Sequence, residues 1–109
     1  MKRGDVVTAV SPGDYGKPRP ALVVQSDLFN ETHASVVVCP ITSHLRPAPL
    51  FRVQLSPSKS NGLRETSQVM VDKIVAVKRE KIRQTVGRIR DAELALVERA
   101  LRLWLGLEG

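Results

Sequence analysis

Short apolar runs, separated by polar stretches rich in proline and glycine, fill the chain from residue 5 to residue 89. The runs are rich in β-branched residues, a composition typical of strands. The connections between the runs are too short for the crossover helices that parallel strands need. The sequence therefore predicts a mainly antiparallel sheet of about six short strands that is strongly curved or barrel-like.

The strand boundaries follow from the turn residues that flank each run. The predicted strands cover residues 5–10, 21–24, 35–41, 51–55, 67–71 and 84–89, and residues 74–77 continue the extended structure. Pro40 lacks a backbone donor, so we expect an edge or a bulge where it lies. One helical turn is predicted over residues 28–32 with Asp27 as its cap, and another over residues 79–82.

The C-terminal segment carries a long helical pattern. Asp91 is a good cap, and Glu93 lies in the first turn, where the helix dipole favours a negative charge. Gly106 is expected to end the helix, and Trp104 to cover an exposed margin of the core. The apolar stripe that is predicted to pack on the sheet consists of Leu94, Val97, Leu101 and Leu105.

The length of 109 residues predicts a single domain, residues 1–109. No apolar run approaches the roughly 18 residues that span a bilayer. The first residues also lack the apolar core of a signal peptide. We therefore expect a cytoplasmic protein that does not contact a membrane.

The balance of charges is strongly basic. Lys and Arg total 17 against 11 Asp and Glu, which gives a net charge of +6. A small domain with this balance attracts polyanions, so the expected partners are nucleic acid, an acidic protein, or both in competition. The alternative is that the cations serve only solubility.

Cysteine and histidine usage gives no sign of a metal site. Cys39 is the single cysteine and cannot form an internal bridge, so we expect a small buried residue there. His33 and His44 are not spaced with acids as a ligand set. A phosphate-binding glycine loop and a serine-hydrolase elbow are also absent from the sequence. We therefore expect no cofactor.

The stretch KPRPALVVQS joins a proline-rich loop to a buried strand. Arg19 lies between Pro18 and Pro20, which both fix φ, so its guanidinium can keep one orientation toward a phosphate. The alternative is an ordinary loop arginine at the mouth of a strand. Tyr15 in the same loop either stacks on a base or caps the edge of the core.

Polar groups also emerge at the ends of two other predicted strands. These groups are Thr42, Ser43 and His44 after one strand, and Asp72 and Lys73 after the other. A second basic loop, residues 56–64, contains an Asn-Gly turn signal. The sequence thus places most of its polar chemistry in two loops and at one strand end, that of Thr42, Ser43 and His44.

Four segments together resemble the MazF/PemK family of toxin endoribonucleases. In chain order they read RGDVV, RPALVVQSD, VVVCPITS and SQVMVDKI. The resemblance implies the CcdB/MazF-type toxin fold, an SH3-like barrel with a terminal helix, and a homodimer. It also implies the toxin of a type II toxin-antitoxin system that cleaves single-stranded RNA at specific sequences without a metal, and that a short acidic antitoxin inhibits.

The resemblance also assigns roles to residues of this chain. Arg19 corresponds to an arginine that donates a proton or stabilises the phosphorane, and Thr42 to a threonine that holds a phosphate oxygen near it. Ser43 lies beside this threonine in the same motif, and Ser67 corresponds to a serine that faces the substrate groove. Asp72 aligns with the acid of an acid-glutamine pair. Arg19 and Thr42 are therefore the expected catalytic residues.

The chain departs from the family pattern at two places. Lys73 replaces the usual glutamine of the acid-glutamine pair, and the first loop lacks the segment where some members carry a catalytic Glu or His. The general base is therefore open among Asp14, Lys17 and His44. The residues expected to bind substrate are Lys17, Ser43, His44, Ser67 and Asp72.

Three functions remain as hypotheses. The first is an endoribonuclease that leaves a 2′,3′-cyclic phosphate and a 5′-hydroxyl. The second is a non-enzymatic toxin that binds DNA gyrase through its terminal helix, as in the related CcdB family. The third is an RNA-binding module whose site has decayed. The basic run over residues 73–90 suits an RNA backbone or the acidic tail of an antitoxin.

Overall fold

The computed structural model describes residues 1–13 and 15–107. Its strands are β1 (Asp5–Ala9), β2 (Arg19–Val23), β3 (Ser35–Thr42), β4 (Arg52–Leu55), β5 (Ser67–Met70), β6 (Val75–Lys78) and β7 (Ile82–Arg88). Its helices are α1 (Asp27–Asn30) and α2 (Asp91–Trp104), and two short 3-10 turns are η1 (Val71–Lys73) and η2 (Arg79–Lys81). Each predicted strand overlaps an observed strand, and β6 is a strand of its own.

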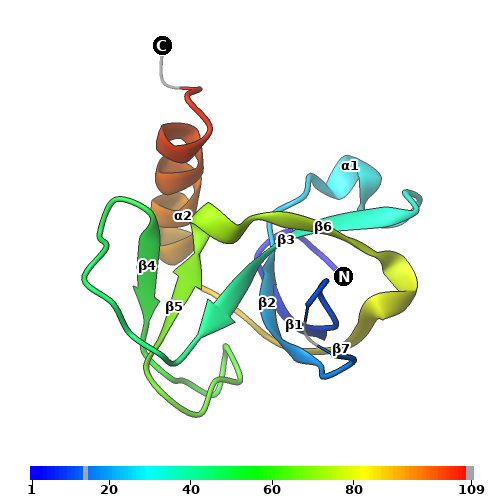
Figure 1. Cartoon of the computed structure of the whole chain (residues 1–109), viewed down its shortest axis with the longest axis horizontal. Helices are drawn as coiled ribbons and strands as arrows, with labels where there is room; N and C mark the ends of the chain where they lie inside the picture. Colours follow the sequence, from blue (N-terminus) through cyan, green and yellow to red (C-terminus); the bar gives the residue numbers. More distant parts are fainter. Residues whose placement is uncertain (14, 108–109) are drawn as a thin grey trace.

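All strand pairs of the described chain are antiparallel, in the order β4-β5-β3-β2-β1-β7, and β6 pairs with β3. The prediction of a mainly antiparallel β fold with a C-terminal helix is confirmed. The prediction of a barrel needs correction, because the pairing among the described residues ends at β4 and β7 and does not close. Figure 1 shows α2 beside β4 and β5. The strongly curved part of the sheet, formed by β1, β2, β6 and β7, lies at the other end of the molecule.

Strand β3 links the two parts of the sheet. Its first residues, 35–38, pair with β6, and its last residues, 41 and 42, pair with β5. Pro40 pairs with Ala21 of β2 on one side of β3. On the other side of β3 it lies between the ladder with β6 and the ladder with β5, and it pairs with neither strand. A proline needs no ladder partner for its nitrogen, so this interruption accommodates it. The predicted local edge at Pro40 is confirmed.

Alternation along β1, β2 and β3 produces two cores. Val6, Leu22 and Cys39 face a larger core that also holds Val97 of α2. Val7 and Val23, on the opposite face, belong to a smaller core inside the strongly curved part of the sheet. Both faces of these strands are therefore covered, which explains why their sequences read as nearly continuous apolar runs.

The helix caps differ from the predicted ones by one residue. Ser26 caps α1, because its Oγ accepts the N–H of Leu28 at 3.2 Å, whereas Asp27 lies inside the helix and accepts the N–H of Arg3 at 2.8 Å. This contact with Arg3 is long-range, so local sequence does not reveal it. Arg90 is the cap of α2, and its N–H donates to the Glu93 carboxylate at 2.9 Å.

The end of α2 also needs one correction. Val97 is fully buried, and Leu94 and Leu101 pack against the larger core as predicted. Leu105 is half exposed, because the helix ends at Trp104 and Gly106 turns the chain away with a φ of +71°. Trp104 lies against Phe51 with ring centroids 5.4 Å apart, which confirms its place at the core margin. None of the described helices is long and apolar enough to cross a membrane.

Candidate functional site

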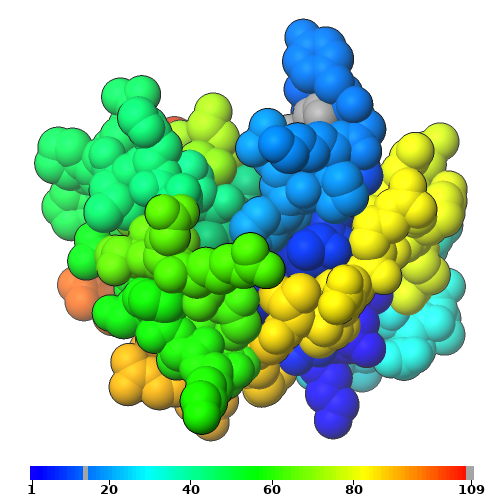
Figure 2. Space-filling view, turned by 90° about the horizontal axis from the view of Figure 1, so that it is seen from below, coloured from blue at the N-terminus to red at the C-terminus, as the bar shows by residue number. Residues whose placement is uncertain are grey.

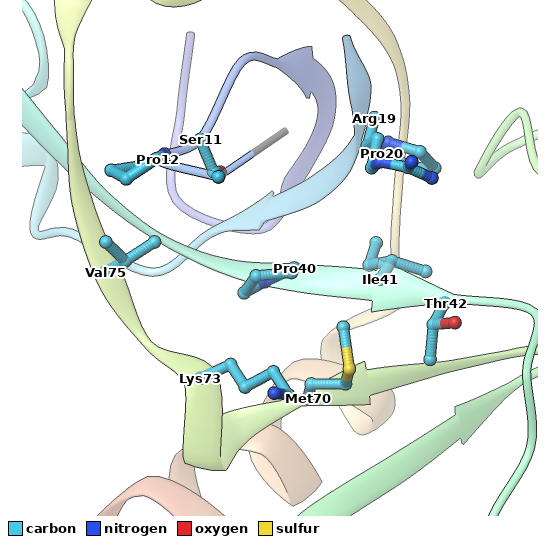
Figure 3. A pocket seen from close by; sticks show the side chains of 11 residues that line it. Ser11, Pro12, Arg19, Pro20, Pro40, Ile41, Thr42, Met70, Lys73 and Val75 are labelled. Atoms are coloured by element: carbon cyan, nitrogen blue, oxygen red, sulfur yellow. The ribbon is translucent and has the colours of Figure 1, made fainter. Parts of the chain in front are cut away.

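A groove crosses the sheet where β2 and β3 lie side by side. It consists of two hollows of about 460 and 420 Å³, which we call the first and second hollows. Both are lined by Arg19, Pro20, Ile41 and Thr42. In Figure 3, Arg19 and Thr42 lie on the same side of the first hollow, and Lys73 and Met70 border it from below.

The sheet register brings Arg19 and Thr42 together. β2 begins at Arg19, two residues earlier than predicted, and Arg19 pairs with Ala9 of β1. On the other side of β2, Ala21 pairs with Pro40 of β3. If the same antiparallel register is continued by two residues, back along β2 and forward along β3, Arg19 lies opposite Thr42. Residues two apart in a strand point to the same face. The arginine is therefore part of a paired strand and not of a free loop.

The turn after β3 orients the Thr42 hydroxyl. Its Oγ1 accepts the backbone N–H of His44 at 3.0 Å, which leaves the hydroxyl proton available to donate into the groove. The carbonyl of His44 accepts from Arg52 at 3.0 Å, so the turn is anchored to β4. The exposed His44 side chain lines neither hollow, whereas Ser43 lines the second one.

The two predicted site residues that follow strands β3 and β5 have different environments. Ser67 is buried at the start of β5, lines the second hollow and donates to the Glu65 carbonyl at 2.9 Å. Asp72 lies in η1 and lines neither hollow, and its Oδ1 is buried without a hydrogen bond from any described residue. The structure therefore brings Ser67 to the groove and leaves Asp72 outside it.

Cys39 lies directly before Pro40 and is fully buried, as expected. Burial, together with the negative charge of Asp72, raises the pKa of its thiol to about 12. A thiol with this pKa is almost entirely protonated near neutral pH and is a poor nucleophile. Cys39 therefore contributes packing behind the groove and not chemistry in it.

The β1–β2 loop, which connects β1 and β2, contributes less to the groove than the sequence indicated. Lys17 is exposed and lines neither hollow. Asp14, the other loop candidate for a general base, lies outside the described residues. The loop reaches the first hollow instead through Ser11, Pro12 and Gly13.

Some polar lining residues were not predicted as site residues. Among them, Thr8 of β1, Arg64 at the end of the second loop and Glu65 directly after it line the second hollow. The loop reaches the groove because it lies directly on β7: the N–H of Arg88 donates to the Ser60 carbonyl at 2.7 Å. A Cβ on Gly87 would lie 2.4 Å from the Asn61 carbonyl carbon, so only glycine permits this approach. The Asn-Gly pair in the sequence predicts a turn in this loop, but it does not indicate that the loop contacts β7.

The described chain holds no group of three His, Cys, Asp or Glu side chains that could bind a metal ion. The described groove offers instead the cations of Arg19, Arg64 and Lys73 beside the hydroxyl groups of threonine and serine. Arginine and hydroxyl donors are suited to a phosphate group whose negative charge increases during reaction. The arrangement therefore favours phosphodiester chemistry at the level of Arg19 and Thr42.

Comparison of the sequence with protein families gives a match over most of the chain. Residues 2–105 match the family described as the PemK-like, MazF-like toxin of type II toxin-antitoxin systems. The chain is 42% identical to the probable endoribonuclease MazF of Mycolicibacterium smegmatis, over 100% of both chains. It is 28% identical to the endoribonuclease EndoA of Bacillus subtilis, over 98% of this chain and 96% of the other.

Solved structures agree with the sequence matches. An endoribonuclease from a mycobacterial species, in complex with its cognate antitoxin, superposes with a TM-score of 0.84 at 26% identity and covers 100% of this chain and 98% of its own. A MazE-MazF structure from Deinococcus radiodurans superposes with a TM-score of 0.78 at 26% identity, over 97% of this chain and 95% of its own.

Proposed function

This chain belongs to the PemK-like, MazF-like family of type II toxins, and from that premise we propose that it cleaves single-stranded RNA at the groove between β2 and β3. It is the toxin of a toxin-antitoxin pair and an endoribonuclease, like its relatives. The observation that carries the proposal is the placement of Arg19 and Thr42 at one level of adjacent strands, lining both hollows.

The proposed reaction uses the 2′-hydroxyl of the RNA as nucleophile. Its oxygen attacks the adjacent phosphorus, the bond to the 5′-oxygen of the next nucleotide breaks, and the products carry a 2′,3′-cyclic phosphate and a 5′-hydroxyl. The guanidinium of Arg19 stabilises the extra negative charge on the phosphorane and is the proposed proton donor to the leaving oxygen. Thr42 donates to a non-bridging phosphate oxygen and holds it beside the arginine.

The remaining groove residues position the substrate. Ser43, Ser67 and Arg64 surround the second hollow, and Lys73 adds a cation to the first. Lys17 and Asp72 line neither hollow, so we place them outside direct contact with the cleaved phosphate. His44 also lines neither hollow, but its backbone N–H donates to Thr42, which keeps it beside the groove.

Two described residues are candidates for the general base. Among the described residues that line the groove, Glu65 is the only carboxylate, and His44 adjoins Thr42 through its backbone hydrogen bond. The variant that removes the base lowers kcat and abolishes one limb of the pH-rate profile. Glu65→Gln and His44→Gln, compared in this way, decide between the two groups.

We further propose that the toxin is a cytoplasmic homodimer that an acidic antitoxin inhibits. The net charge of +6 and the basic groove favour an acidic partner. The C-terminal segment supports the dimer, because Leu103, Trp104, Leu105 and Leu107 are each about half exposed or more. An apolar segment of this kind suits either a core or an interface, and its exposure favours the interface.

The alternative of a CcdB-like toxin that binds DNA gyrase is not favoured. The relatives that cover the chain from end to end are named as endoribonucleases. A protein that only binds another protein also has no need for an arginine and a hydroxyl at one level of a groove.

The deciding experiment incubates the purified protein with a mixed-sequence RNA and with its DNA counterpart in excess EDTA, and maps the ends of the fragments. We expect cleavage of RNA only, at a short recurring sequence, with cyclic-phosphate and 5′-hydroxyl ends. Uncleaved RNA in the presence of folded protein would contradict the proposal, and inhibition of gyrase would then be the next assay.

A further inference from the structure

We propose that a third hollow, on the far side of the β1–β2 loop from the groove, binds a further nucleotide of the same RNA; this inference rests on the proposed function. The third hollow has a volume of about 410 Å³. It shares Ser11, Pro12 and Gly13 with the first hollow, so the two are separated only by this loop. The other lining residues are Val10, Tyr15, Gly16, Ala76, Val77, Lys78 and Lys81.

Tyr15 is the aromatic residue of this hollow, and its side chain is fully exposed. Its φ of +52° lies in the left-handed region, which is unfavourable for a residue with a large side chain. The ring therefore does not cap the core, although the sequence allowed that. Figure 2 shows the β1–β2 loop, in blue, projecting from the body of the molecule. A ring held out on a strained backbone is available to stack on a base.

Two cations line the same hollow as the tyrosine. Lys78 ends β6 and Lys81 ends η2, and both are exposed. Neither forms an ion pair with any acid in the described part of the chain. The N–H of Val10 donates to the Lys81 carbonyl at 3.0 Å, which fixes the start of the loop against η2. The acid nearest in sequence, Glu80, does not line the hollow.

The chemistry of the third hollow matches a nucleotide better than an acidic peptide. An aromatic face beside two ammonium groups provides a stacking surface for a base and counter-charges for the flanking phosphates. A glutamate-rich peptide would use the lysines and leave the ring without a partner. The three hollows follow one another in the order second, first, third, so one RNA strand that passes Arg19 continues past Tyr15.

The test compares Tyr15→Ala, Tyr15→Phe and the double variant Lys78→Ala/Lys81→Ala with the wild type. The control is Lys2→Ala, which removes an exposed cation that lines none of the three hollows. Each protein is assayed on a long RNA around the mapped cut and on progressively trimmed RNAs. Binding is measured on the same RNAs with a 2′-deoxy nucleotide at the cut, as a function of salt.

We expect Tyr15→Ala to lower kcat/KM on the long RNA about 10-fold through KM, in line with the loss of one stacked base. The phenylalanine variant keeps the ring and behaves as the wild type. The lysine variant lowers the salt dependence of binding by about 0.7 in log-log slope per lost phosphate contact. All variants match the wild type on an RNA trimmed to the shortest cleavable length.

Equal cleavage and equal salt dependence in wild type and variants on the long RNA would overturn the inference. So would variants that bind RNA normally but bind poly-glutamate more weakly, since the hollow would then belong to an acidic peptide. If the wild type does not cleave RNA at all, the proposed function fails. The binding series on uncleaved RNA still decides whether Tyr15 and the two lysines contact a nucleotide.

Discussion

Arg19 has a fixed backbone because two constraints act on it together. Pro18 and Pro20 restrict the chain on both sides, and pairing with Ala9 holds the residue in β2. A fixed backbone sets the point from which the guanidinium reaches a phosphate, so binding has only the rotamers of the side chain left to order. The prolines were visible in the sequence, whereas the strand pairing at Arg19 was not, because prolines next to a strand usually mark its end.

Replacing Arg19 by alanine removes the only group proposed to stabilise the phosphorane by its charge. We expect Arg19→Ala to lower kcat by about 10²-fold or more, by analogy with the loss of one charge-stabilising donor, with little change in melting temperature. Cleavage of a mapped RNA and thermal unfolding measure the two effects. Arg83→Ala, an exposed arginine that lines none of the hollows, is the matched control. Full activity of Arg19→Ala would refute the assigned role.

Cys39 provides a residue-scale test of burial. Because burial raises the pKa of its thiol from 9.0 to about 12, native protein should resist iodoacetamide at pH 8 and react only after denaturation. The Cys39 thiol keeps its proton to a higher pH in the folded state than in the unfolded chain. The stability that results from this difference is complete below pH 9 and decreases as the pH rises toward 12. Mass spectrometry after alkylation is the measurement. Rapid modification of the native protein would contradict the buried placement.

At the scale of elements, the start of α2 depends on Glu93. Burial would raise the pKa of this carboxyl, but hydrogen bonds from the Arg90 side chain and backbone lower it below the ordinary value of 4.5. The resulting stability is complete above pH 4.5 and is lost as the pH falls through the lowered pKa. We expect Glu93→Ala to destabilise the fold by about 1 kcal/mol at pH 7, and Glu93→Gln by less. Urea unfolding of the two variants checks the order.

The second loop provides another test at this scale. Gly62 has a φ of +70°, and a Cβ there would lie 2.3 Å from the Val86 carbonyl oxygen of β7. Gly106 has nearly the same φ but no atom within 4 Å of the equivalent position. Gly62→Ala should therefore lose about 1–3 kcal/mol more than Gly106→Ala, and it should also lose activity because the loop carries Arg64 into the groove. Equal losses in both variants would show that the loop tolerates displacement.

The strands and α2 were predictable because their apolar patterns repeat over several residues. The caps of both helices were each displaced by one residue. At α1 a long-range partner decides the cap, because Asp27 binds Arg3 and leaves the capping role to Ser26, whereas at α2 the local pair of Arg90 and Glu93 decides it. That the sheet stays open instead of closing into the predicted barrel was not predictable either. Where β3 changes partners at Pro40, the sheet divides into two parts, and a pattern of alternating residues contains no information on which strand is the neighbour.

At the scale of the whole molecule, the groove combines residues from segments that are distant in the sequence. Arg19, Thr42 and Ser67 were assigned through the resemblance and do line it. Glu65 and Arg64 were missed because only the contact between the second loop and β7 brings them there. Asp72 was expected in the groove, but the η1 turn directs the chain so that its carboxylate is partly buried near Cys39.

The exposed apolar surface of α2 argues for a second copy of the chain. Val97 and Ala100 already fix one side of α2 on the core, yet Leu96 and Leu103 stand on another side at a spacing of seven. Together with Leu50 they border a hollow of about 550 Å³ between α2 and the segment before β4. A helix with two apolar faces is stable in water when both are covered. A twofold-symmetric contact is the usual arrangement for a homodimer.

We therefore expect the wild type to sediment with twice the mass of one chain, and Leu103→Glu to sediment as a single chain with its sheet intact. A glutamate at this position would lose much of its hydration when the two copies associate, which disfavours association. Leu45→Glu is the control, because Leu45 is similarly exposed but lies in the loop after β3 and does not line this hollow. If Leu103→Glu remains dimeric while Leu45→Glu dissociates, the interface lies at the loop after β3, and α2 faces solvent or the antitoxin.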